Sequence, residues 1–148
     1  TEYDTVCLES EGEYTLTASL PTITGDITLI GNGAQINMMG GEQIFNVAET
    51  GALTLKDVTI SGGNATQGGA INNAGELILK DVILENHSAV RGGAIYNAGV
   101  LTMKNGAIQN NSASEFGGGI YNAGQMSLDG VNIRENDAPE GSGVYQGG

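Results

Sequence analysis

The ionisable side chains are the first candidates for chemistry, and the chain is rich in acids and poor in bases. It has 17 Asp and Glu residues against five Lys and Arg residues and one histidine. A polysaccharide-cleaving site would need clustered carboxylates to hold calcium and a basic residue to take a proton from the sugar. Three of the five cations instead recur at one spacing, each followed by Asp or Asn, which predicts a surface column of neutralised charge. These cations are Lys56, Lys80 and Lys104.

The single histidine, His87, is a weak candidate for a base or a metal ligand. The chain has an internal repeat of 24 to 25 residues, in which Gly63, Asn111 and Asn136 occupy the position that corresponds to His87. We therefore expect His87 to be a solvated corner residue. The acidic residues of the C-terminal half follow neither EF-hand nor nonapeptide spacing. We therefore predict no catalytic residue, no metal, no cofactor and no enzymatic activity. A polysaccharide-active enzyme is the least favoured alternative.

Charge and hydropathy exclude several partners. A net charge of −12 repels nucleic acid phosphates and anionic lipid headgroups. No apolar run reaches the roughly 18 residues that a membrane span needs. We expect no nucleic acid partner and no membrane insertion. The first residues also lack the basic start of a signal peptide, so for an extracellular or cell-surface protein we expect the signal to have been removed.

An internal repeat organises the chain and must position any site. Five glycines, Gly51, Gly75, Gly99, Gly124 and Gly148, are 24, 24, 25 and 24 residues apart. Within each repeat three short segments alternate apolar and polar residues, the pattern of β-strands. Residues 51–148 are regular, and residues 1–50 follow the same period more loosely. The sequence therefore predicts a single domain over 1–148.

The strands are too short and too closely spaced to leave room for helices. Stacking each repeat in parallel on the one before it, roughly 4.8 Å away, would bury every second side chain in a central column. We predict an all-β parallel β-helix of about six coils of about 24 residues, with three short strands per coil. The one extra residue must lie between Ala113 and Ile120, and we place it as a corner bulge within residues 114–116.

Two side-chain columns follow from this register. An amide column can hydrogen-bond along its length; its members are Asn73, Asn97, Asn122 and Gln146. An outward aromatic column would stabilise the sheet face, or provide a lateral contact or glycan-binding strip. Its members are Tyr96, Tyr121 and Tyr145, with Asn72 and Phe45 in the earlier copies.

Three N-glycosylation sequons begin at Asn64, Asn86 and Asn110, all near one corner between the second and third strands. The high content of Asn, Ser and Thr in this chain would by itself produce such motifs often, so the three sequons are candidate modification sites only. The single cysteine, Cys7, cannot form an internal disulfide.

A family resemblance rests on residues 92–99, which read Gly-Gly-Ala-Ile-Tyr-Asn-Ala-Gly and have weaker copies at 68–75 and 117–124. The motif resembles the repeats of polymorphic outer-membrane-type surface proteins and adhesins. The segments 4–8, 12–16 and 25–31 look like the first coils of the same class of β-helix protein. The resemblance implies a right-handed, single-stranded helix and an extracellular setting, and it specifies fold better than function.

The ends of the predicted solenoid suggest self-association. Gly148 stands where each earlier repeat starts its next strand, so we expect it to be continued by Thr5, Val6, Cys7 and Leu8 of another subunit, with Val144 also at the joint. Such a head-to-tail contact does not close and yields a filament. The leading hypothesis is a non-enzymatic structural or surface protein, as a filament or surface array. The alternative is the binding module of a larger adhesin, with a glycan or host-cell surface as its partner.

Overall fold

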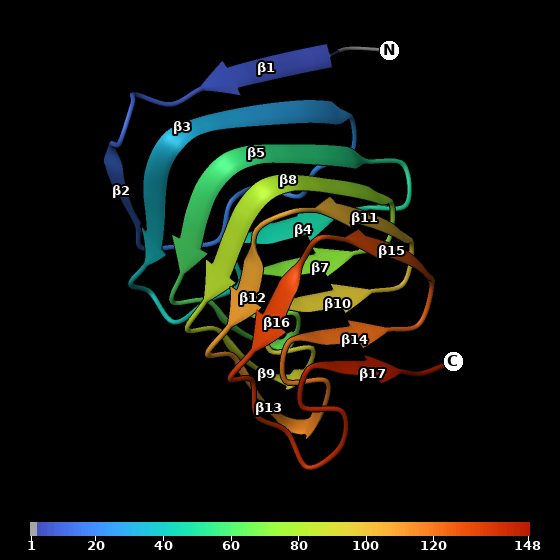
Figure 1. The fold of residues 1–148 in the computed structure, drawn as a ribbon. Helices are drawn as coiled ribbons and strands as arrows, with labels where there is room; N and C mark the ends of the chain where they lie inside the picture. The colour runs from blue at the N-terminus through green and yellow to red at the C-terminus, as the bar shows by residue number, and fades with distance from the viewer. Residues whose placement is uncertain (1–2) are drawn as a thin grey trace.

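The computed structural model describes residues 3–148, except for the side chain of Tyr3, and this part of the chain contains strands and no helix. The strands stack in parallel as a β-solenoid of about six turns (Figure 1). This confirms the predicted parallel β-helix and its coil length.

The largest of three sheets has nine strands and forms two sides of the solenoid. Its main path contains β1 (Tyr3–Cys7), β3 (Asp26–Met38), β5 (Ala52–Ser61), β8 (Glu76–Glu85), β11 (Val100–Lys104) and β15 (Gln125–Asp129). Beside that path lie β2 (Glu13–Leu16), β12 (Ala107–Gln109) and β16 (Asn132–Arg134).

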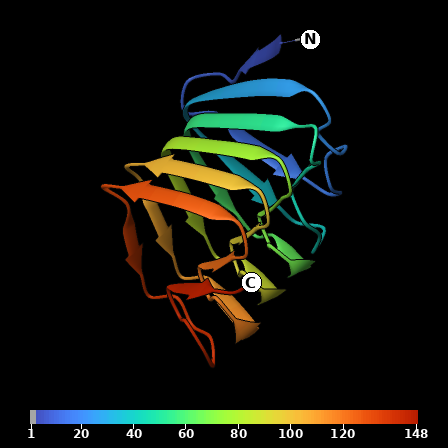
Figure 2. The ribbon, with the colours of Figure 1, turned by 90° about the vertical axis from the view of Figure 1, so that its right-hand side faces the viewer.

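The two smaller sheets complete each coil. Five strands form one of them, namely β4 (Phe45–Val47), β7 (Ile71–Asn73), β10 (Ile95–Asn97), β14 (Ile120–Asn122) and β17 (Val144–Gln146). Three strands form the other, namely β6 (Asn64–Gln67), β9 (Ser88–Arg91) and β13 (Ser112–Phe116). Figure 2 shows the strands of successive coils lying one below another.

Register pairing places like residues in columns along the axis. Leu53, Leu77 and Leu101 are register partners on successive strands and are each at most 1% exposed. Because side chains alternate across a strand, one residue in two enters this core. The burial of these apolar columns holds the coils together through the hydrophobic effect. Within residues 3–148 no helix covers the sheets.

The first corner differs from the prediction of three separate strands, because β3, β5 and β8 each continue through it as one bent strand. A residue with positive φ makes the bend in β5 and β8, namely Asp57 at 50° and Asp81 at 55°. Asp and Asn tolerate this left-handed conformation better than most residues. The Asp or Asn after each lysine is thus explained by backbone geometry, since Asn105 after Lys104 also has a positive φ of 58°.

The interpretation of the lysine column as neutralised charge is not supported by ion pairing. Within residues 3–148 the one salt bridge joins Arg91 to Glu115, 3.0 Å apart. The lysines therefore form an in-register column without a paired carboxylate.

The third corner carries the irregularity where it was predicted. The register between β9 and β13 shifts between Ala113 and Phe116. The extra residue is absorbed by this bulge, and pairing resumes so that Ile120 again faces Ile95.

One register assignment was wrong. Phe45 pairs with Ile71 and is 3% exposed, so it belongs to the core and not to the aromatic column. Asn46, which pairs with Asn72, is the true earlier copy in that outward column.

Candidate functional site

The amide column is a continuous hydrogen-bonded ladder inside the solenoid. Nδ2 of Asn73 donates to Oδ1 of Asn97 at 2.8 Å, and Nδ2 of Asn97 donates to Oδ1 of Asn122 at 2.7 Å. Each of the three asparagines is at most 2% exposed. The spare N–H groups of Asn73 and Asn97 bond backbone carbonyls of the next coil, at Val100 and Gln125. Amide side chains can be buried when their hydrogen-bonding groups have partners, as they do in this ladder.

Gln146 ends this ladder differently from its predecessors. Its Oε1 accepts a bond from Asn122 at 2.8 Å, while its Nε2 turns back to the carbonyl of Asn122 at 3.2 Å. The longer side chain therefore satisfies its own donor within the last two coils.

A second buried polar column surrounds His87, and the expectation of a solvated corner residue was wrong. His87 is 2% exposed. Its Nδ1 accepts the N–H of Gly63 at 2.9 Å, and its Nε2 lies 2.9 Å from the carbonyl oxygen of Ile60. Since a carbonyl can only accept, Nε2 carries the proton and the ring is neutral. Burial lowers the pKa of His87 from 6.5 to about 4, against the opposing effect of the bond to Ile60.

The same column continues through asparagines that make equivalent bonds. Nδ2 of Asn111 donates to the carbonyl of Leu84 at 3.1 Å, and its Oδ1 accepts the N–H of His87 at 3.0 Å. Nδ2 of Asn136 likewise donates to the carbonyl of Ile108. His87 thus takes the place of an asparagine. The asparagines at two of its repeat positions were the sequence signal for this second ladder.

The tyrosine column lies on the surface and is joined by residues that the sequence reasoning missed. Tyr96 and Tyr121 stack with ring centroids 4.9 Å apart, and Tyr121 and Tyr145 stack at 5.3 Å. Phe116, from the bulge, packs against Tyr145 with ring centroids 4.6 Å apart. The guanidinium carbon of Arg91 lies over the ring of Phe116, 5.7 Å from its centroid. We call these five residues the aromatic strip. The tyrosines stack on one another, so they present mainly ring edges to the solvent.

The three sequons do not share one repeat position. Asn86 and Asn110 are exposed and have φ of 59° and 56°, so each stands at a left-handed corner that favours Asn. Asn64 lies two positions later, since it pairs with Ser88. The middle residues of the second and third sequons, His87 and Asn111, belong to the buried column.

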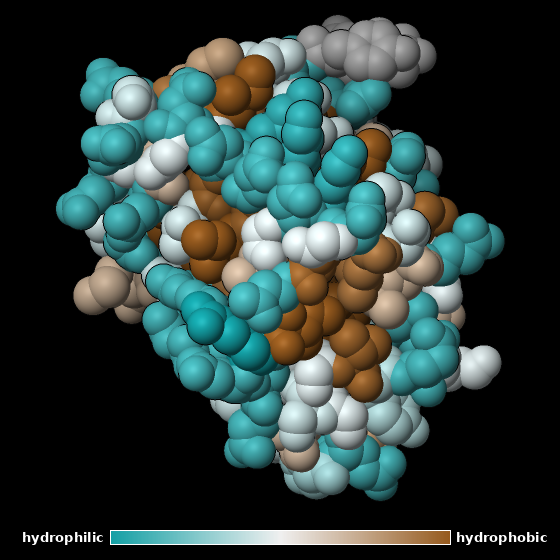
Figure 3. Space-filling model, in the orientation of Figure 1, coloured by the Kyte–Doolittle hydropathy of each residue, from teal (hydrophilic) through white to brown (hydrophobic). Residues whose placement is uncertain are grey.

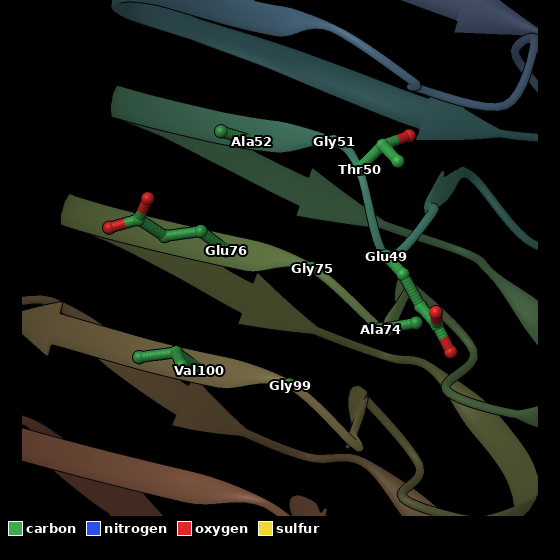
Figure 4. Close-up of a pocket in the computed structure, with 9 residues that line it drawn as sticks. All are labelled: Glu49, Thr50, Gly51, Ala52, Ala74, Gly75, Glu76, Gly99 and Val100. Carbon is green, nitrogen blue, oxygen red and sulfur yellow. The ribbon is translucent and has the colours of Figure 1, made fainter.

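A glycine-floored groove of about 630 Å³ follows another corner (Figure 4). Its glycines are required by packing, because a Cβ at Gly75 would lie 2.2 Å from the carbonyl oxygen of Gly51. The two carboxylates at the groove, Glu49 and Glu76, point in opposite directions (Figure 4). Among residues 3–148 there is no group of three or more His, Cys, Asp or Glu side chains placed to hold a metal ion.

The N-terminal end of the solenoid is open and apolar. A cavity of about 360 Å³ reaches into it between the first coil and the second. Its lining residues are Val6, Leu20, Pro21, Thr22, Ile23, Ile27, Leu29, Phe45 and Leu53. Val6 is 45% exposed there and Leu8 is half-buried, whereas Thr5 and the free thiol Cys7 are exposed.

The C-terminal end is also apolar. Its strands β15, β16 and β17 each pair only with the strand of the preceding coil. Apolar side chains gather in the area that these strands enclose (Figures 1 and 3). They are the half-buried Met126, Leu128, Val131, Ile133 and Val144. Gly148 follows with φ of 94°.

Comparison with known proteins supports the predicted class. The model of the Chlamydia polymorphic membrane protein repeat matches residues 82–98 and 105–123. With the parallel solenoid, these matches fit a β-helix repeat protein that is similar to the polymorphic membrane proteins. That class is associated with the cell surface and outer membrane.

Neither the curated proteins nor the solved structures yield a match. In the described part of the chain no helix is long and apolar enough to cross a membrane.

Proposed function

We propose that this chain is a non-enzymatic structural protein of the cell surface whose solenoid associates end to end with further copies of itself. The observation that carries the proposal is the surface that the first and last coils of this chain offer for continued strand pairing. Each end combines unpaired strand edges with apolar side chains that inner coils bury completely, as the 0% exposure of Leu101 illustrates. Unpaired edges and exposed cores are the features that drive β-strand association.

The arrangement of the ends favours a head-to-tail contact. All paired strands in the solenoid are parallel, and a second copy could continue that pairing only by placing its first coil on the last coil of its neighbour. Such a heterologous contact leaves a free end on each copy and grows into a filament. The joint would involve Thr5, Val6, Cys7 and Leu8 on one side and Val144 to Gly148 on the other.

Electron microscopy combined with sedimentation velocity tests the proposal. We expect filaments with an axial repeat of about 30 Å, which is six coils at about 4.8 Å. Leu128→Glu should abolish them, because it places a charge at a core-facing position of the last coil, whereas Thr102→Glu changes charge equally on an outward position. Monodisperse rods at every concentration, or equal assembly of the two variants, would overturn end-to-end association.

The second candidate is an adhesin-type binding module, and the aromatic strip favours it. Tyr and Arg side chains are enriched at the centres of protein interfaces, and three tyrosines, a phenylalanine and an arginine meet here. The partner would be a glycan or a host-cell surface. The self-stacked rings limit a sugar to their edges and to the Phe116–Arg91 side.

A glycan array and cell-binding assay would test the second candidate. Phe116→Ser with Arg91→Ser should abolish binding, while Ile78→Ser, an exposed apolar change on another sheet, should leave it intact. Binding that survives the first pair of changes would exclude the strip as the contact surface.

A further inference from the structure

The outward face of the largest sheet exposes two apolar side chains on the inner coils. Alternate residues of β5, β8 and β11 point outward, because the residues between them enter the core. Ile78 is 36% exposed on β8, and Val100 is 40% exposed on the neighbouring strand β11. An exposed apolar cluster with a polar rim is typical of an interaction surface.

Three columns of side chains run along this face, parallel to the solenoid axis. The middle column contains Thr28, Thr54, Ile78, Thr102 and Ser127. The column on one side contains Ala52, Glu76 and Val100, which line the glycine-floored groove on successive strands (Figure 4). The column on the other side contains Lys56, Lys80 and Lys104.

The lysine column concentrates positive charge in an acidic chain. Three of the five Lys and Arg residues stand in register here, although like charges on paired strands repel one another. Within residues 3–148 the one salt bridge joins Arg91 to Glu115, so these lysines have no ion-pair partner there. The column is therefore available to a partner outside the chain.

The outward face of β8 is complementary to itself. It presents Glu76, Ile78 and Lys80, which are an acid and a base on either side of an apolar centre. Consider a second copy related by a two-fold axis that runs beside Ile78, parallel to the solenoid axis. Each Glu76 then faces Lys80 of the other copy, and Ile78 faces Ile78. Such an isologous contact closes with two copies.

The neighbouring strands fit the same axis. This rotation keeps each coil level with the same coil of the second copy, so Lys56 faces Ala52 and Lys104 faces Val100. The lysine column of each copy then lies over the glycine-floored groove of the other. A second copy turned end over end would instead set one lysine column against the other. Charge complementarity therefore selects the parallel arrangement.

We propose that this face binds a second copy of the chain side by side and in parallel, with two reciprocal Glu76–Lys80 ion pairs. The contact is made by inner coils, so it is independent of the end-to-end association proposed above. Copies attached to one cell surface would share this parallel orientation. The face is about 20 Å by 15 Å, and interfaces this small give weak dimers that form at high local concentration.

Charge reversal on β8, followed by sedimentation equilibrium, tests the ion pairs. Lys80→Glu and Glu76→Lys each oppose like charges at both pairs, and each should raise the dimer dissociation constant by about tenfold. The double variant Glu76→Lys with Lys80→Glu restores both pairs and should return the constant to within about threefold of the parent. Arg134→Glu reverses an exposed cation outside this face and should leave the constant nearly unchanged. Circular dichroism checks that each variant is folded.

Crosslinking tests the orientation of the two copies. In a Cys7→Ser chain, a short thiol crosslinker should join two copies through Thr102→Cys, because residue 102 faces itself in the parallel dimer. Thr66→Cys, on an exposed position of the third sheet, should give far less product. Equal yields from the two positions would overturn the parallel contact.

The same measurements in the Leu128→Glu chain separate this contact from end-to-end association. Dimers that persist there and respond to Lys80→Glu would support the side-by-side contact even if no filament ever forms. A parent chain that is monomeric at every concentration, or loss of all association in Leu128→Glu, would overturn it. So would equal weakening by Lys80→Glu and Arg134→Glu, or a double variant no stronger than its single changes.

Discussion

The stability of this protein should depend on the protonation of one buried histidine. His87 has an ordinary pKa of 6.5 when unfolded and a pKa of about 4 in the folded solenoid. The depressed value means that the fold favours the neutral ring. The corresponding stability is complete above pH 6.5 and is lost as pH falls from 6.5 toward 4.

The magnitude follows from the difference between the two pKa values. Each unit of difference corresponds to about 1.4 kcal/mol, so His87 alone should remove about 1.4 kcal/mol at pH 5.5 and about 3 kcal/mol at pH 4. That is a large part of the roughly 5–15 kcal/mol by which domains are stable. The main structural cause is the burial of the ring, which disfavours its charged form. The second proton would also have to bind Nδ1, which accepts the N–H of Gly63.

The matched variant is His87→Asn, because Asn111 makes the equivalent bonds one coil later. Urea unfolding followed by circular dichroism at pH 7, 5.5 and 4 gives the free energy of unfolding of both proteins. The two proteins carry the same carboxylates, so the difference between the curves isolates His87. The chain has one histidine, and its imidazole resonances can also be titrated directly by NMR.

Parallel curves for the parent and His87→Asn would refute the reasoning, as would an NMR titration of the folded protein centred near pH 6.5. Either result would mean that the ring is solvated.

Three further changes probe the ladders and corners by urea unfolding. Asn97→Ala should lower the free energy of unfolding by about 2–4 kcal/mol, because it leaves buried amide groups of the adjacent rungs unpaired. A change of less than about 0.5 kcal/mol, the scale typical of surface substitutions, would contradict this. Gly99→Ala should lower the free energy of unfolding by about 1–3 kcal/mol, since its Cβ would lie 2.1 Å from the carbonyl oxygen of Gly75. The control Gly25→Ala, whose Cβ would have nothing within 4 Å, should leave the stability nearly unchanged. Equal effects of the two substitutions would exclude steric crowding as the cause. Asp81→Val should cost about 1–2 kcal/mol because φ is 55° there, and Asp81→Gly should not.

Much of the fold was predictable because the solenoid repeats its own local pattern. The columns of Leu53, Leu77 and Leu101 recur at a fixed spacing, and parallel stacking is the arrangement that buries all of them at once. The same logic located the bulge before Ile120. Where the spacing loosens, as at Phe45, counting from one end assigned the wrong face, since a one-residue slip moves a side chain from the surface to the core.

The residues of the candidate sites were less predictable. Spacing placed Asn73, Asn97, Asn122 and Gln146 in one column, but it could not show that Gln146 turns its amide back. The same spacing grouped His87 with glycine and asparagine, yet it could not show which side of the corner faces inward. The contact of Phe116 with Tyr145 depends on how the bulge folds over the sheet.

The sequence by itself determined the period, the strand pattern and the acidic surface, because these are properties of residue order and composition. Only the tertiary structure decided that His87 is buried, that the Asp or Asn after each lysine serves a left-handed corner, and that Phe45 faces the core. The physical reason is that burial and facing depend on which backbone atoms lie in the coils above and below. The repeat predicts that such coils exist, and the register of the folded chain sets what each side chain meets there.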